Sequence, residues 1–235
     1  MKILALETSA KAASCAVLED GTLLASAFQC TGLTHSRTLM PMVEAMLKNA
    51  DLTPADADVI AVAAGPGSFT GLRIGIAAVK GLAWALDKPC VAVSTLEAMA
   101  RSAAHLDALL IGAMDARRAQ VYNALFEAKD GALTRLTPDR ALSLEALCEE
   151  LRGDTRRKLI LGDGGHLCCD YLVQHGVACT LAPPALVQQS AVGVALAAQE
   201  AVARGETVSA QELAPVYLRP PQAERLRTAR TGQES

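Results

Sequence analysis

Aromatic side chains are scarce in this chain of 235 residues: phenylalanine, tyrosine and tryptophan make up 3% of it, whereas apolar residues of all kinds make up 51%. A hydrophobic core must therefore be built mainly from alanine, leucine and valine, and the length suits one large domain or two small ones. A large excess of charge is also lacking, since the formal net charge at pH 7 is −3. This balance argues against an extensive nucleic-acid-binding surface.

Sequence signals for membranes, secretion and metals are missing as well. No uninterrupted apolar run reaches about 18 residues, and the N-terminus lacks the apolar core of a signal peptide, so we expect a cytoplasmic chain without a membrane span. The seven cysteines are odd in number and include no Cys-x-x-Cys motif, which favours reduced thiols. No two of the four histidines lie three or four residues apart, as a helical metal-binding pair would require. We predict neither a metal nor a cofactor.

The most distinctive stretch is the string GPGSFTGLRIG, which follows an apolar run typical of a buried strand, residues 59–64, and begins a helical pattern that ends at Leu86. It comprises a glycine-rich motif of Gly65, Pro66, Gly67, Ser68, Phe69 and Thr70, followed by Gly71, Leu72, Arg73, Ile74 and Gly75. Glycines permit positive φ angles or the close approach of another backbone. The string is compatible with a phosphate at the helix N-terminus, with a second helix packed on small residues, or with a simple turn.

The string does not match the common nucleotide-binding loops. A Walker loop needs Gly-Lys-Ser/Thr after its spacer, and a Rossmann fingerprint needs a third glycine where Thr70 stands. We therefore interpret the string as the start of a helix that packs closely, both within its own domain and against a partner.

Two helices of the first half carry candidate interaction residues. On the helix predicted over 35–50, Leu39, Val43 and Met46 share a stripe, and three methionines leave apolar surface that either binds a partner or is buried within the domain. Pro41 either kinks this helix or marks its first turn. On the helix over 70–86, Arg73, Lys80 and Trp84 lie on a different face from the small residues, and interfaces favour arginine and tryptophan.

The strand pattern of the first half restarts near residue 109. Residues 3–9 and 111–117 each form an apolar strand that ends in an acid and a polar turn, and each leads to a second strand and a hairpin turn. This similarity predicts duplicated halves. We expect a first domain at 1–104, a smaller second domain at 105–218 whose last helix, about 190–204, packs back on the first, and a flexible arginine-rich tail at 219–235.

Acids occupy the equivalent turns of the two halves. Glu7 and Asp115 could together hold Mg²⁺ and position phosphates in a cleft, but their turns lack the glycine that would let a phosphate approach the backbone. We interpret them as exposed turn acids, with Glu7, Thr8, Ser9 and Asp115 forming at most a vestigial nucleotide turn.

Six motifs occur in a characteristic order along the chain: ILALETS at 3–9, His35-Ser36, GPGSFTGLRIG at 65–75, MDAR at 114–117, GDGG at 162–165 and PVYLR at 215–219. Together they resemble the TsaB (YeaZ) family, the non-catalytic relatives of TsaD. The duplicated opening resembles the actin, sugar kinase and Hsp70 superfamily. The resemblance implies an α/β chain with a duplicated actin-like ATPase (ASKHA) fold, built from two βββαβα-type domains of which the second is reduced.

The resemblance also implies a function as an accessory subunit in making N6-threonylcarbamoyladenosine (t6A) in tRNA. The implied partners are a TsaD-like transferase and a TsaE-like ATPase, and tRNA is contacted only through the complex. Members of the family pair with TsaD, or with themselves, through the two helices of the first half. Carried onto this sequence, the partner-binding residues are His35, Leu39, Val43, Met46, Gly71, Arg73, Gly75 and Lys80.

The turns that hold phosphate in the superfamily are eroded in this chain, and a His-x-x-x-His pair is absent, so we predict a subunit without its own catalysis. We expect Gly75→Leu or Arg73→Glu to break pairing while leaving the fold intact. One alternative is an independent ATP-dependent kinase or ATPase of the same fold, and another is a metallopeptidase.

Overall fold

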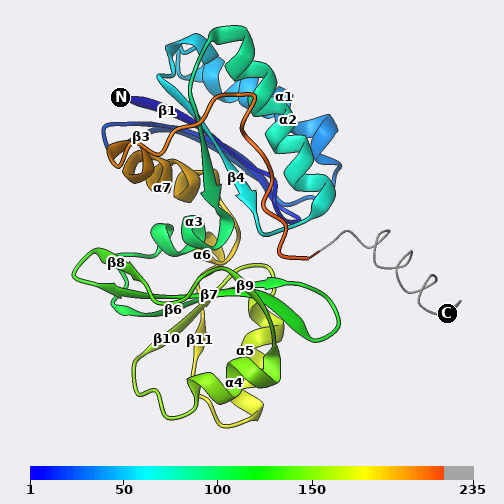
Figure 1. Cartoon of the computed structure of the whole chain (residues 1–235), viewed down its shortest axis with the longest axis vertical. Coiled ribbons are helices and arrows are strands. Elements are labelled where there is room, and N and C mark those ends of the chain that lie inside the picture. Colours follow the sequence, from blue (N-terminus) through cyan, green and yellow to red (C-terminus); the bar gives the residue numbers. More distant parts are fainter. Residues whose placement is uncertain (220–235) are drawn as a thin grey trace, which may run out of the picture.

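The computed structural model describes residues 1–219, which form two β-sheets with helices between and outside them (Figure 1). All but the first residue of the predicted tail, 219–235, lies outside the described residues. From one end to the other, the layers are α1 with α2, the first sheet, α3 with α7, the second sheet, and α4 with α5. The predicted α/β class is confirmed.

The first sheet has five strands in the order β3-β2-β1-β4-β5. Its strands are β1 (Lys2–Glu7), β2 (Ala13–Glu19), β3 (Thr22–Gln29), β4 (Val59–Gly65) and β5 (Cys90–Ser94). The first three strands pair in an antiparallel manner, whereas β4 pairs with β1 and β5 in parallel. Every residue of β4 is buried, as expected for a parallel strand that is covered on both faces.

The second sheet repeats this connectivity, with its strands in the order β8-β7-β6-β10-β11. Its strands are β6 (Ala108–Asp115), β7 (Gln120–Lys129), β8 (Ala132–Arg135), β10 (Lys158–Leu161) and β11 (Thr180–Leu181), and β9 (Arg140–Ser143) also pairs with β7. When β9 is set aside and the strands of each half are numbered along the chain, both sheets have the spatial order third, second, first, fourth, fifth. The predicted duplication is therefore confirmed. The last strand, β11, has only two residues, so the second copy is reduced.

The helices form three layers that together cover both faces of each sheet. They are α1 (His35–Asn49), α2 (Phe69–Leu86), α3 (Thr95–Ser102), α4 (Leu144–Leu151), α5 (Gly165–Gln174), α6 (Pro184–Val187) and α7 (Ala191–Ala203), with a 3₁₀ turn, η1, at Pro54–Asp56. Serine side chains at four N-caps accept backbone N–H groups that would otherwise lack a partner: Ser68, Ser94, Ser143 and Ser190. Pro41 lies inside α1, and the helix continues past it to Asn49.

The two middle helices cross between the halves. Helix α3 packs Leu96 and Met99 into the core of the second sheet, beside Phe126, whereas α7 packs a row of buried alanines onto the first sheet. Where the helices meet, a Cβ at Gly193 would overlap the carbonyl oxygen of Ala98, so glycine permits the close crossing. The predicted division at 104/105 assigns α3 to the first domain, although this helix covers the second sheet. The division remains a proposal.

Among the described helices, α2 is long and apolar enough to cross a membrane by length and composition alone. A core helix passes the same test, and here Leu72, Ile76 and Val79 are buried in the core of the first half.

Candidate functional site

A cleft of about 570 Å³ opens between the two halves, at the end of the sheets where several turns converge. Its walls come from the β1–β2 turn, the β4–α2 loop, the β6–β7 turn and the C-terminal residues 216–219. The lining includes three aromatic side chains (Phe69, Tyr122, Tyr217), three cationic ones (Lys11, Arg117, Arg219) and two acidic ones (Asp115, Asp163). This mixture of charges and rings suits a polar ligand or a peptide segment better than an apolar molecule.

The acid of the first turn lies beneath the cleft rather than in solvent. Glu7 is fully buried, and its Oε1 accepts a hydrogen bond from the backbone N–H of Ser9 at 2.5 Å. The interpretation of Glu7 as an exposed turn acid is therefore wrong. The β4–α2 loop covers this turn, because the N–H of Ser68 donates to the carbonyl oxygen of Ser9 at 2.6 Å.

Burial raises the pKa of Glu7 to about 7, and the nearby charge of Asp163 raises it further. Asp163, in the GDGG motif after β10, lies at the surface of the cleft, yet its pKa is raised, first by the partial desolvation of its carboxylate between neighbouring segments and also by the charge of Asp115. The charge of Asp163 in the second half thus interacts both with Glu7 in the first half and with Asp115. The sequence reasoning paired Glu7 with Asp115 and missed Asp163, although an acid in the glycine turn that follows a buried strand was a signal that could have found it.

The carboxylate of Asp115 is bound by groups of its own turn. It accepts the backbone N–H of Arg117 at 2.7 Å and pairs with the guanidinium of the same residue at 3.2 Å. Two buried oxygens below the cleft, Glu7 Oε2 and Ser9 Oγ, have no hydrogen-bond partner among the described residues. Within residues 1–219, no three His, Cys, Asp or Glu side chains are placed to hold a metal ion together.

The glycines of α2 pack against the first turn of the same chain. A Cβ at Gly71 would overlap the carbonyl oxygen of Thr8, and a Cβ at Gly75 would overlap its hydroxyl. That hydroxyl donates to the carbonyl oxygen of Gly71 at 2.8 Å, which fixes the turn against the helix. The expectation that Gly75→Leu leaves the fold intact is therefore wrong, since the added side chain has no room.

The basic residues of α2 contact the C-terminal segment of the same chain. Arg73 donates from Nε to the Tyr217 hydroxyl at 3.0 Å, and its guanidinium lies 3.8 Å from the centre of the Phe69 ring. Lys80 donates to the carbonyl oxygen of Gln211 at 3.2 Å. At the start of α1, the Nε2 atom of His35 lies 2.7 Å from the carbonyl oxygen of Ala10. Sequence reasoning missed Tyr217, although its motif PVYLR was noticed.

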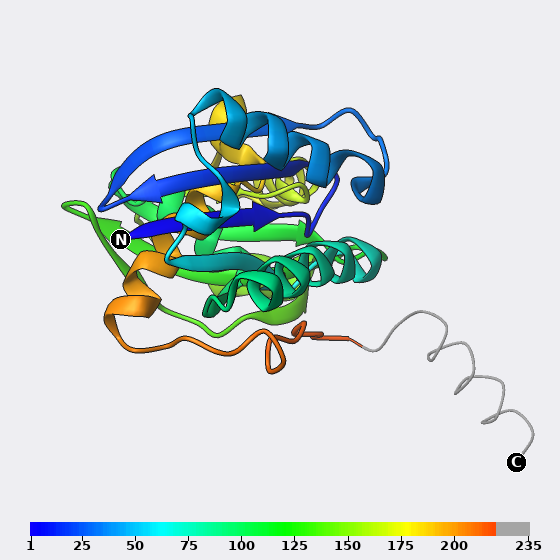
Figure 2. The ribbon, with the colours of Figure 1, turned by 90° about the horizontal axis from the view of Figure 1, so that it is seen from above.

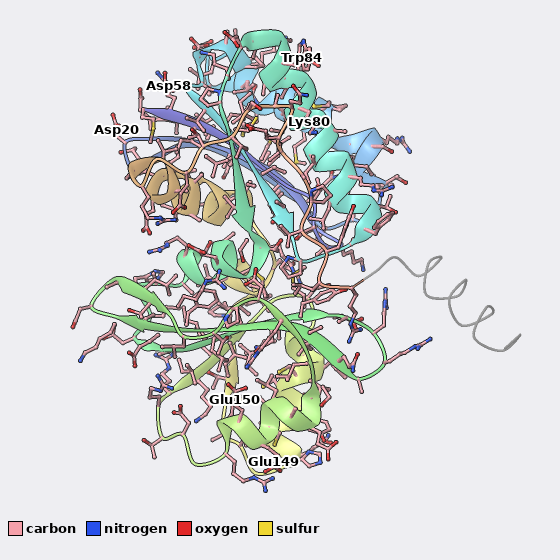
Figure 3. The ribbon with its side chains drawn as sticks, viewed as in Figure 1. Asp20, Asp58, Lys80, Trp84, Glu149 and Glu150 are labelled. Carbon is pink, nitrogen blue, oxygen red and sulfur yellow. The ribbon has the colours of Figure 1, made fainter. Side chains whose placement is uncertain are left out.

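Leu39, Val43 and Met46 are buried between α1 and the first sheet. The predicted set of partner-binding residues stays a prediction. Arg73 of this set is exposed, whereas the solvent-facing sides of α1 and α2 consist mainly of other residues. We call these residues the α1–α2 surface: Arg37, Met40, Pro41, Glu44, Ala45 and Lys48 on α1, and Ala77, Gly81, Trp84 and Ala85 on α2. Trp84 is 75% exposed and Met40 is 40% exposed (Figure 3 shows Trp84 and Lys80 on α2).

Comparisons with known proteins agree with the fold and the motifs. A family model described as TsaD, tRNA N6-adenosine threonylcarbamoyltransferase, matches residues 30–225. The chain is 41% identical over 162 residues to the tRNA threonylcarbamoyladenosine biosynthesis protein TsaB of Bacillus subtilis, covering 69% of this chain and 71% of that protein. It is 31% identical over 222 residues to the protein of the same name from Escherichia coli, covering 93% and 95% of the two chains.

A solved structure of YeaZ from Pseudomonas aeruginosa has a TM-score of 0.79 and 33% identity to this chain, with 92% of this chain and 99% of that one covered. The relatives named TsaB are described as biosynthesis proteins and not as transferases. Sequence motifs, duplicated sheets and near full-length relatives agree that this chain belongs to the TsaB (YeaZ) family.

Proposed function

We propose that this chain is an accessory, non-catalytic subunit of a cytoplasmic system that makes t6A in tRNA. In this role it binds a TsaD-like transferase and supports its activity together with a TsaE-like ATPase. The support comes from the names of its relatives, tRNA threonylcarbamoyladenosine biosynthesis proteins, and from their coverage of most of the chain. A complete catalytic set is not evident among the described residues, since Glu7 is buried, Asp115 is bound by its own turn and Asp163 accepts a hydrogen bond from Gln189.

The observation that carries the proposal is the α1–α2 surface. A tryptophan that is 75% exposed is unusual, because burying such a ring removes a large apolar area from water. Tryptophan is also among the residues that most often dominate binding energy at protein interfaces. The other residues of the α1–α2 surface are alanine, glycine, proline and charged side chains, and small residues of this kind let a helical partner approach closely.

We predict that Trp84→Glu weakens binding of a TsaD-like protein by at least about 2 kcal/mol, or roughly 30-fold in Kd, because it places a charge where an apolar ring would be buried. Isothermal titration calorimetry of the two purified proteins measures the effect. The matched control is Val173→Glu on α5, where an exposed apolar residue at the opposite end of the molecule receives the same charge. Equal affinities for Trp84→Glu and Val173→Glu would refute the interface.

A second candidate function is nucleotide binding in the cleft, which three aromatic rings and three cationic side chains favour. In that case Lys11→Ala, which removes an exposed cation from the rim, should lower the affinity for ATP severalfold in calorimetry with the chain alone. The accessory-subunit proposal expects no saturable ATP binding in the micromolar range. Such binding, weakened severalfold in Lys11→Ala and unchanged in Lys48→Ala on α1, would favour the nucleotide-binding function instead.

A further inference from the structure

The chain does not end at α7 but runs back over the first half, alongside α2 (Figures 1 and 2). Val208 and Cys90 exchange both backbone hydrogen bonds, at 2.8 and 2.9 Å, which adds a short bridge to the edge of β5. Leu213 is then buried in the core below α2, and the carbonyl oxygen of Gln211 accepts from Lys80. These contacts fix the path of the C-terminal segment on the first half.

Residues 215–219 then cross from the first half to the second. The N–H of Val216 donates to the carbonyl oxygen of Ala64 at 2.7 Å, at the end of β4. A Cβ at Gly65 would overlap the carbonyl oxygen of Val216, so a glycine is needed where the segment passes. Tyr217 packs its ring on Phe69, with 5.0 Å between ring centres, and its hydroxyl accepts from Arg73.

At the other side of the cleft, Arg219 contacts the second half. Its Nη1 donates to the carbonyl oxygen of Ala116 at 3.0 Å, and its Nη2 donates to the Oε1 of Gln120. The guanidinium also lies 5.9 Å from the centre of the Tyr122 ring. Arginine suits such a site because its planar fork satisfies two acceptors at once while stacking on an aromatic face.

We infer that residues 215–219 form a latch that holds the two halves together across the cleft, and that α2 controls the latch through Arg73. The halves contact each other through α3 and α7, whereas the latch spans the cleft on its open side. Opening the cleft therefore separates Arg219 from the β6–β7 turn, or draws Tyr217 away from α2. Arg73 is exposed, and it lies on the helix that carries Trp84, so a protein bound there competes for it or reinforces its contact.

The control of the latch by a bound protein rests on the proposed function, whereas the latch itself does not. Hydrogen exchange of the full chain without a partner tests the latch, with the Val216 amide and the amides of the turn at 116–120 as reporters. We expect Arg219→Ala and Arg73→Ala each to speed exchange of Val216 by roughly tenfold or more, and Arg219→Ala also to speed exchange in the turn. Arg37→Ala, an exposed arginine on α1, is the matched control and should change neither reporter.

Unchanged exchange at Val216 in both variants would overturn the latch, as would faster exchange at Val216 with an unaltered turn in Arg219→Ala. A third measurement adds a saturating TsaD-like protein to the wild-type chain. A changed exchange rate at Val216 supports control through α2. An unchanged rate in a complex that has formed overturns this control and leaves the proposed function standing. Failure to form any complex counts against the proposed function alone, since the variants test the latch without a partner.

Discussion

Gly71→Ala is expected to destabilise the protein by about 1–3 kcal/mol, although glycine to alanine in a helix ordinarily stabilises. The added Cβ would overlap the carbonyl oxygen of Thr8, a backbone atom of the neighbouring turn. That turn cannot easily retreat, because the Thr8 hydroxyl is bonded to Gly71 and the N–H of Ser9 is bonded to the Glu7 carboxylate. The helix and the turn must therefore separate, and several buried contacts weaken together.

Gly81 supplies a control on the same helix. A Cβ there meets nothing within 4 Å, so Gly81→Ala should raise stability by about 0.5–1 kcal/mol through reduced freedom of the unfolded chain. Urea unfolding followed by circular dichroism compares the two variants, and the free energies of unfolding should change in opposite directions. A stabilising effect at both positions would show that the turn at Thr8 does not press against α2.

Much of the fold could be predicted from local patterns. The first helix was expected over 35–50 and lies at His35–Asn49, since its apolar stripe repeats over four turns. By contrast, β9, α5 and α6 were not predicted. Strand β9 has only four residues, of which none is fully buried, and it exists because β7 is long enough to pair with it as well as with β8. Helix α5 begins with glycine and carries two adjacent cysteines, so its pattern is weak.

The site could be predicted less well because its contacts join residues that are far apart in the sequence. Glu7 belongs to a polar stretch that looks exposed, yet it is fully buried, and the turn that follows it is bonded to the β4–α2 loop about 60 residues later. Arg73 and Tyr217 are 144 positions apart, so nothing local indicates that the arginine contacts its own chain. The family resemblance predicted the function and the two helices that bind a partner. Which side chains of those helices face solvent could be established only from the structure.

The buried acid below the cleft makes stability depend on pH. Glu7 has a pKa of about 7 in the folded chain, against an ordinary value of 4.5. Between these two values the unfolded chain has released this proton while the folded chain still holds it, so the free energy of unfolding falls as pH rises. The full cost, about 3 kcal/mol, is present above pH 7 and absent below pH 4.5.

Glu7→Gln should remove this dependence, because the amide stays neutral and its oxygen can still accept the N–H of Ser9. The free energy of unfolding of the variant, relative to that of the wild type, should rise by about 2.5 kcal/mol from pH 5 to pH 8, measured by urea titration at each pH. Glu44→Gln on the exposed face of α1 controls for the loss of one negative charge. Asp163 also has a raised pKa, but it is present in both chains, so the difference between them isolates Glu7. Parallel stability curves for Glu7→Gln and the wild type would mean that Glu7 is ionised throughout this range, and that the cleft admits enough water or a cation to stabilise its charge.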